Sequence, residues 1–378
     1  MIYLDHSATY LTRPPEVMDA VVEAMQTFGN SARGGHSAAM NSSRAIYAAR
    51  TKLSEFFNGY GPEYTIFTAN ATEALNMVIK GILNPGDRVV TTVMEHNSVL
   101  RPLYEMEKQG VELQILPADD KGRLDMEAFY EALNRDVRMV ICTHGSNVTG
   151  NVNDIRTMGQ CCREHGVLFA VDAAQTAGLL PIDMQKDGID LLCFTGHKSL
   201  MGPQGTGGLC IRPGVKIRPL VTGGSGIRTF DLEHPAAYPE ALEAGTLNGH
   251  GIAGLSAGVD FIRNRGMELI YEKAVSLSRL FYNEVSKIPG ICCYGDFSEG
   301  VRLPVVSLNV EGEDSAVVSD WLAVEYDICT RPGGHCAPLI HQHFHTEHQG
   351  MVRFSFSYMN SKEEVYKVVE ALQSFDEM

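Results

Sequence analysis

Lys198 stands where covalent chemistry is possible. It follows an apolar run, residues 189–194, that predicts a buried strand, and a glycine-rich segment comes after it. Burial lowers the pKa of an ammonium group, so a lysine at the exit of a buried strand can present a neutral amine that forms a Schiff base with an aldehyde. A solvated lysine at a strand end is the plainer interpretation, and the neighbouring groups decide between the two.

Other polar groups sit where further predicted strands end. In chain order they are Thr72, His96, Asn147, Asp172 and Gln175, and Ala71 precedes the first of them. Ala71 and Thr72 open a helix whose N-terminal amides can bind a phosphate. A carboxylate can keep a pyridine nitrogen protonated, and an imidazole can stack on the ring. With an aldehyde-reactive lysine, these groups meet the needs of pyridoxal 5′-phosphate (PLP). Taken singly, Asp172 and Thr72 could be helix caps, and His96 could be a structural histidine. The prediction therefore depends on finding all of these residues, in this order, along one predicted sheet.

Cys336 is the candidate reactive thiol. Gly333 and Gly334 precede it and predict a loose backbone, its neighbours are polar, and His335 is adjacent. Such surroundings suit a reactive thiolate, whereas a structural cysteine is the alternative. Further histidines follow at positions 341, 343, 345 and 348, but their spacing fits no tetrahedral template, so we expect no metal site.

Strands and helices alternate through the first half of the chain. The predicted strands are residues 64–69, 88–94, 111–117, 137–144, 167–173 and 189–194. Helices of about ten or more residues between them predict a mostly parallel sheet covered on both faces, with ligand chemistry at the carboxyl ends of its strands. A long helical stretch from about residue 249 is followed by mixed elements. We therefore predict a large α/β domain, residues 15–248, and a small α+β domain, residues 1–14 and 249–378, that carries the Cys336 loop.

Composition narrows the class of protein. A net charge of −15 argues against nucleic acid or an anionic membrane as the main partner. No apolar run reaches 18 residues, so we expect no membrane span and no signal peptide. The nine cysteines are odd in number and include no C-x-x-C pair, so we expect a reducing, cytoplasmic location.

Motifs along nearly the whole chain resemble one family. YLDHSAT, TANATEALN, MEHNS, SNVTGN, VDAAQ, FTGHKSLMGPQGTGGL, RPGGHCAP and RFSFSYMN occur in the order seen in class V PLP enzymes of fold type I, specifically the cysteine desulfurases and selenocysteine lyases. The resemblance implies an α/β transferase fold, with a mostly parallel seven-stranded sheet in a large domain and a smaller α+β domain.

The same resemblance assigns residues to the cofactor. Lys198 would hold PLP as an internal aldimine, Asp172 would face the pyridine nitrogen, and His96 would stack on the ring and take part in catalysis. Thr246 would reach the phosphate of a neighbouring subunit, which implies a homodimer with shared sites. The full implied set is Ala71, Thr72, His96, Asn147, Asp172, Gln175, Thr195, His197, Lys198 and Thr246. Thr195 stands where serine is common, and the hydroxyl is kept.

The resemblance also implies how a substrate is handled. Cys336 would attack the sulfur of the bound amino acid, becoming a persulfide as alanine leaves. Arg353 would clamp the substrate carboxylate, a bidentate role suited to arginine. The remaining implied substrate contacts are Asn147, Arg331 and Arg33. Related loops have two adjacent histidines before the cysteine, and here the first is replaced by Gly334.

Four hypotheses follow. The first is a PLP-dependent desulfurase that acts on L-cysteine and passes sulfur to an acceptor protein. A selenocysteine lyase would share almost every residue named. A class V aminotransferase would not need Cys336, and a non-catalytic sulfur carrier would need neither Lys198 nor a phosphate site.

Overall fold

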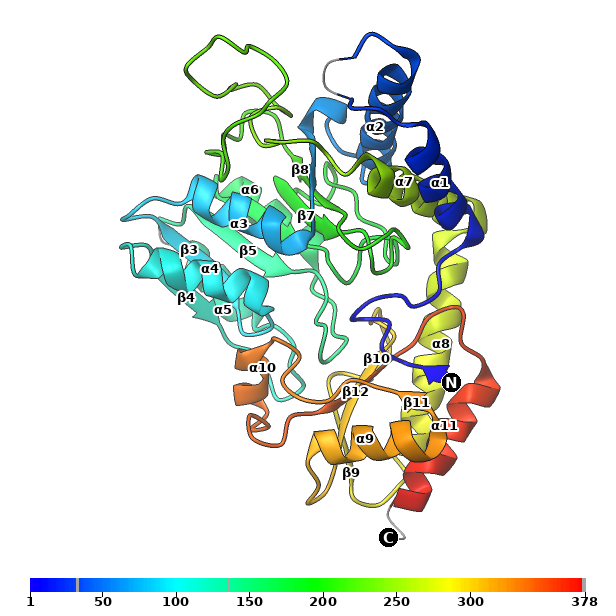
Figure 1. Ribbon diagram of the computed structural model, residues 1–378. Helices are drawn as coiled ribbons and strands as arrows, with labels where there is room; N and C mark the ends of the chain where they lie inside the picture. The colour runs from blue at the N-terminus through cyan, green and yellow to red at the C-terminus, as the bar shows by residue number, and fades with distance from the viewer. Residues whose placement is uncertain (32–33, 135, 376–378) are drawn as a thin grey trace.

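A seven-stranded sheet forms the centre of the protein (Figure 1). The computed structural model describes residues 1–31, 34–134 and 136–375. The strand order is β2-β8-β7-β6-β5-β3-β4, and the neighbouring strands are parallel except where β8 pairs with β2 and β7. The strands are β2 (Thr65–Thr68), β3 (Arg88–Thr92), β4 (Glu112–Leu116), β5 (Met139–Thr143), β6 (Leu168–Asp172), β7 (Leu191–Thr195) and β8 (Gly207–Ile211). The predicted mostly parallel α/β sheet is confirmed.

Both faces of this sheet are buried, which explains its continuous apolar strands. In β5, Val140 and Cys142 face one core while Met139 and Ile141 face the other. One core takes residues of α3 and α4, and the other takes residues of α2, α5, α6 and α7. These helices are α2 (Ser37–Phe56), α3 (Ala71–Ile82), α4 (Asn97–Glu107), α5 (Met126–Leu133), α6 (Ile155–Glu164) and α7 (Gly249–Arg265).

Strand β8 lies in a segment where the sequence pattern predicts no strand. Its first two residues are glycines because the neighbouring chain is too close for a side chain. A Cβ at Gly207 would lie 2.8 Å from the backbone of Asn70, and one at Gly208 would lie 2.4 Å from the Phe194 ring. The glycines that weaken the strand pattern are therefore what lets β8 enter the sheet.

A second group of elements lies below the sheet in Figure 1. It contains the antiparallel sheet β12-β10-β9 and the parallel pair β1-β11. Its strands are β1 (Ile2–Tyr3), β9 (Ile291–Tyr294), β10 (Val305–Val310), β11 (Ile328–Cys329) and β12 (Val352–Ser355). Its helices are α8 (Met267–Val285), α9 (Ser315–Tyr326), α10 (Pro338–His343) and α11 (Lys362–Phe375). The pairing of β1 with β11 brings the start of the chain beside its last third.

The helical stretch after residue 248 is two helices rather than one. Gly266 ends α7 with a φ of 88°, a conformation that glycine adopts without strain. Helix α7 packs on α1 (Pro15–Thr27) and α2, whereas α8 packs on α11 and β10. The stretch thus connects both groups of elements, and the division into residues 15–248 and the remainder stays a prediction. A short 3₁₀ helix, η1 (Pro62–Tyr64), precedes β2. Within the described residues no helix is both long and apolar enough to cross a bilayer.

Candidate active site

A cavity of about 220 Å³ lies at the carboxyl ends of the central strands. It brings together most of the residues that the sequence predicts for the site. Those that line it are Ala71, Thr72, His96, Asn147, Asp172, Gln175, Thr195, His197, Lys198, Arg331 and Arg353. Thr246 and Cys336 are not among its lining residues, and Arg33 lies outside the described residues.

The turn after β7 presents Lys198 to this cavity. The Gly196 N–H donates to the Thr206 carbonyl at 2.8 Å, and the Met201 N–H donates to the Lys198 carbonyl at 2.8 Å. A Cβ at Gly196 would lie 2.1 Å from the Thr206 hydroxyl, so only glycine fits this turn. Burial lowers the pKa of Lys198 to about 8, although the Asp172 charge opposes the shift. The neutral amine needed to attack an aldehyde is therefore abundant in mildly alkaline solution.

Asp172 ends β6 and is buried beside Lys198. Burial raises its pKa, while the Ala174 N–H, which donates to Oδ1 at 2.9 Å, and the Lys198 charge favour the carboxylate. A carboxylate in this position can pair with a protonated ring nitrogen.

His96 caps α4 and presents an uncharged ring to the cavity. The Ser98 N–H donates to Nδ1 at 3.0 Å, so the proton of the neutral ring is on Nε2. Burial, and next the Lys198 charge, lower its pKa to about 4. Behind it, the Glu95 Oε1 accepts bonds from the Thr143 N–H at 2.9 Å and the Thr92 hydroxyl at 2.7 Å. Burial raises the pKa of Glu95 to about 8, which limits negative charge behind the site.

The start of α3 offers unused donors. Asn70 caps the helix through its side chain, which accepts from the Glu73 N–H at 3.0 Å. Among the described residues, the N–H groups of Ala71 and Thr72 have no acceptor, as expected for the first turn of a helix. Thr195 and His197 face the same cavity from β7 and the turn after it. These groups can bind a phosphate.

Arg353 lies on β12 and is 1% exposed. Its Nη2 contacts Asp5 Oδ1 at 2.7 Å, and its Nη1 donates to the Asn147 carbonyl at 3.1 Å. Its buried Nε has no partner among the described residues. The guanidinium is thus held in place with donors to spare, as a clamp for a small carboxylate requires.

The Cys336 loop is anchored, although its glycines predict a loose backbone. The Gly333 N–H donates to the Met351 carbonyl at 3.0 Å, and the bond in the opposite direction measures 3.2 Å. The Asn97 N–H donates to the Cys336 carbonyl at 2.6 Å. Because Asn97 follows His96, this bond places the exposed Cys336 at the edge of the cavity.

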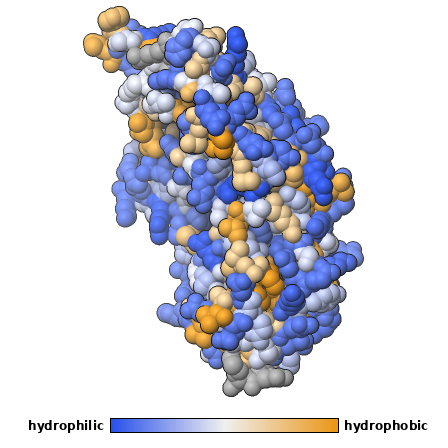
Figure 2. Space-filling model, turned by 45° about the vertical axis from the view of Figure 1, so that its right-hand side comes forward, coloured by the Kyte–Doolittle hydropathy of each residue, from blue (hydrophilic) through white to orange (hydrophobic). Residues whose placement is uncertain are grey.

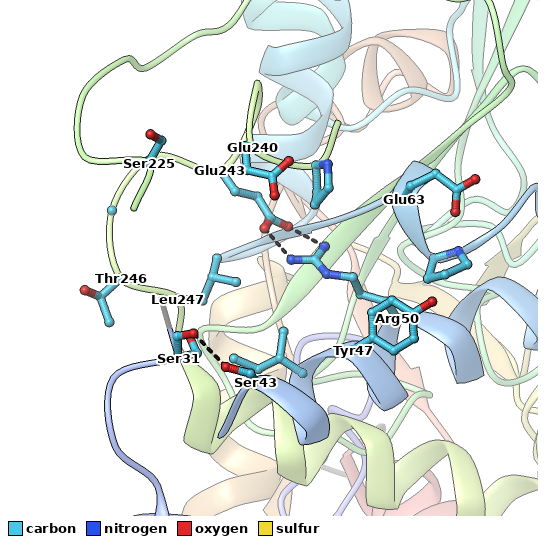
Figure 3. Close-up of a pocket in the computed structure, with 14 residues that line it drawn as sticks. Ser31, Ser43, Tyr47, Arg50, Glu63, Ser225, Glu240, Glu243, Thr246 and Leu247 are labelled. Carbon is cyan, nitrogen blue, oxygen red and sulfur yellow. Dashed lines mark hydrogen bonds and ion pairs between the residues drawn. The ribbon is translucent and has the colours of Figure 1, made fainter. Parts of the chain in front are cut away.

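Thr246 lies elsewhere, on a loop that lines a different pocket (Figure 3). An ion pair between Arg50 and Glu243 fixes this loop, and the Phe67 N–H of β2 donates to Glu243 at 2.6 Å. Figure 3 shows the Thr246 side chain directed away from that ion pair. Within one chain, then, Thr246 is held by the large sheet but does not line the Lys198 cavity.

Several lining residues are absent from the sequence predictions. They are Ser7, Ala8, Asn70, Ser98, Thr143, Gly145, Ala174 and His335. Most of them stand within two positions of a predicted residue, so the motifs that predict the site also contain these residues. Ser7 and Ala8 belong to the YLDHSAT motif, whose place in the site depends on a bond between the Ser7 N–H and the Ser355 hydroxyl at 2.9 Å.

The residues present fit PLP. A partly buried amine, a buried carboxylate, an uncharged flat ring and free helix-terminal donors share one cavity. No group of three or more potential metal ligands occurs among the described residues.

Comparisons with known proteins agree with this geometry. The sequence profile of the family Aminotransferase class-V matches residues 2–368. A probable cysteine desulfurase of Methanothermobacter thermautotrophicus is 33% identical, over 98% of this chain and 94% of the relative. A cysteine desulfurase of Haloferax volcanii is 32% identical, over 100% of this chain and 90% of the relative. The apo structure of cysteine desulfurase from Thermococcus onnurineus NA1 aligns with a TM-score of 0.93 at 32% identity, covering 99% of this chain and 94% of that one.

Proposed function

Since the chain belongs to the class V aminotransferase family and, within it, to the cysteine desulfurases, we propose that it binds PLP and converts L-cysteine to L-alanine, with Cys336 as the sulfur acceptor. The observation that carries the proposal is the joint placement of Lys198, Asp172 and Arg353 in one cavity with Cys336 bonded at its edge.

In this proposal the cavity holds the cofactor through separate groups. Lys198 provides the amine, Asp172 pairs with the ring nitrogen, and His96 and Gln175 contact the ring. The phosphate binds the N–H groups that open α3, together with Thr195 and His197. When bound, PLP supplies an electron sink for bond cleavage at the substrate.

The chain's own side chains then handle the amino acid. Arg353 and Arg331 bind its carboxylate, with Asn147 beside them, and the low pKa of Lys198 lets its Nζ accept and return a proton near neutral pH. Arg33, which lies outside the described residues, stays a proposed carboxylate contact.

Cys336 takes the sulfur atom. A bond forms between Cys336 Sγ and the substrate sulfur, and the bond between the substrate sulfur and Cβ breaks. One L-cysteine and one Cys336 thiol thus give one L-alanine and one Cys336 persulfide, so atoms and electrons balance without an added oxidant. A sulfur-acceptor protein would then regenerate the thiol.

A product assay separates the proposal from its rivals. The purified protein with PLP is given L-cysteine, L-selenocysteine, or L-alanine with a keto acid. We expect alanine with sulfide from L-cysteine in the presence of a thiol reductant. Alanine from selenocysteine alone would favour a selenocysteine lyase, and amino transfer to the keto acid alone would favour an aminotransferase.

We also infer a homodimer in which Thr246 serves the neighbouring site. Hydrophobic side chains gather in patches on the face shown in Figure 2, coloured orange. Exposed apolar residues include Met18, Val22 and Met25 on α1, and Phe230 and Leu232 in the segment before the Thr246 loop, the last two almost fully exposed. Such surfaces support burial against a second subunit.

Mixed dimers test this sharing of sites. Lys198→Ala and Thr246→Asp are each expected to inactivate the homodimer, the second by repelling the phosphate. If Thr246 acts across subunits, a mixed dimer keeps one intact site, and random reassembly of equal amounts should restore about a quarter of wild-type activity. Activity that stays at the level of the separate variants would contradict the shared site.

A cytoplasmic location is part of the same proposal. All nine cysteines are free, and two of them, Cys292 and Cys336, are exposed. Exposed free thiols suit a reducing compartment.

A further inference from the structure

Behind the Cys336 loop, three buried side chains form a line of contacts. His335, next to Cys336, has Nε2 2.9 Å from the Arg331 carbonyl and Nδ1 3.5 Å from His341 Nε2. His341 has Nδ1 2.8 Å from the Thr346 hydroxyl. The two imidazoles lie nearly parallel, with ring centroids 5.7 Å apart, and all three side chains are at most 4% exposed.

The contacts allow only one arrangement of protons among neutral groups. A carbonyl can only accept, so His335 Nε2 carries a proton and its Nδ1 is an acceptor. His341 must then donate from Nε2, which leaves its own Nδ1 to accept from the Thr346 hydroxyl. Burial lowers the pKa of both histidines, which keeps both rings neutral. The Arg331 carbonyl therefore fixes the direction of the whole chain, and the Thr346 hydroxyl ends it as the donor that His341 Nδ1 requires.

This chain supports an unfavourable backbone conformation at the thiol. His335 and Cys336 both have positive φ, 49° and 55°, although neither is glycine. Two successive residues in the left-handed region persist only where the surroundings hold them. From the cavity, Asn147 Nδ2 donates to the His335 carbonyl at 2.9 Å. The ring of His335 is in turn held by the Arg331 carbonyl and by His341 Nε2.

We propose that the buried His335–His341–Thr346 chain positions the Cys336 thiol for attack on the substrate sulfur, a proposal that rests on the function proposed above. His335, His341 and Thr346 are positioning residues in this role. The substrate side of the site has support that the chain does not supply, because the Arg331 and Arg353 backbones exchange two hydrogen bonds of 3.2 and 2.9 Å. Loss of the chain should therefore move the thiol and leave the carboxylate site intact.

A matched pair of variants of the holoenzyme tests this positioning. Thr346→Val keeps the shape and loses the hydroxyl, whereas Thr346→Ser keeps the hydroxyl. For Thr346→Val we expect kcat for alanine formation from L-cysteine to fall about tenfold, the size expected for one lost hydrogen bond in a buried network. Thr346→Ser should stay within about twofold of wild type. The inhibition constant of L-alanine, which reports on the substrate site, should be unchanged in both.

Any result other than the expected one overturns the positioning role. An unchanged kcat in Thr346→Val, an equal loss in Thr346→Ser, or a parallel weakening of L-alanine inhibition would do so. If Thr346→Val does not fold, His341→Phe keeps a flat ring and removes both nitrogens, and the same split between kcat and L-alanine inhibition is expected. Failure of the wild-type protein to form alanine from L-cysteine would instead overturn the proposed function, so the two failures are distinguishable.

Discussion

Lys198→Ala is expected to yield a folded protein that shows no visible Schiff-base absorbance with PLP and makes no measurable alanine. No other lysine is among the residues that line the cavity, so the variant loses both the covalent attachment and the proton carrier. We expect alanine formation to fall by about a thousandfold or more, in line with the loss of an acid–base group that is also the nucleophile. Absorbance spectra and an alanine assay measure the two effects.

Lys186→Ala is the matched control. Lys186 is exposed and pairs with Asp183 at the surface, so its loss should leave absorbance and activity unchanged. A visible band that survives in Lys198→Ala would contradict the assignment of the reactive amine. The pH dependence gives a second check. Because only the neutral amine attacks the aldehyde, PLP uptake by the wild-type apoprotein should accelerate as pH rises through about 8, the lowered pKa of Lys198.

Cys336→Ser is expected to separate cofactor binding from sulfur removal. The visible absorbance should persist, since Cys336 does not line the cavity that holds the PLP-binding groups. Alanine formation from L-cysteine should fall by about a thousandfold or more, because a serine hydroxyl is far less nucleophilic than a thiolate and cannot accept sulfur as a persulfide. Alanine and sulfide are both measured.

Cys292→Ser provides the control here, since Cys292 is the other exposed cysteine and lies on β9. It should behave as wild type. Cysteine turnover that continues in Cys336→Ser would point to simple elimination or transamination, and the persulfide proposal would fail.

The residues at strand ends were predictable because the physical signal is local. Strands β6 and β7 are apolar up to their last residues, so Asp172 at the end of β6 and Lys198 just after β7 stand out. Parallel strands with both faces covered place such ends at one edge of the sheet. A pattern of strands and helices therefore suffices to bring His96, Asn147 and Asp172 together.

Contacts between distant segments were not predictable from local pattern. Asp5 and Arg353 are 348 positions apart, and their ion pair depends on the pairing of the first strand with β11. The anchoring of the Cys336 loop likewise depends on Asn97 and Asn147, which belong to the large sheet. The effect of a glycine also depends on its surroundings. Gly207 and Gly208 permit a strand where the pattern predicts none, and Gly266 ends a helix where the pattern predicts one continuous stretch.

The measurement that tests the account most directly is a single turnover of the holoenzyme with L-cysteine, followed by peptide mass mapping of all nine cysteines. The account predicts one added sulfur atom on Cys336 for each L-alanine formed. L-Alanine released while Cys336 stays unmodified, or sulfur found on a different cysteine, would contradict it.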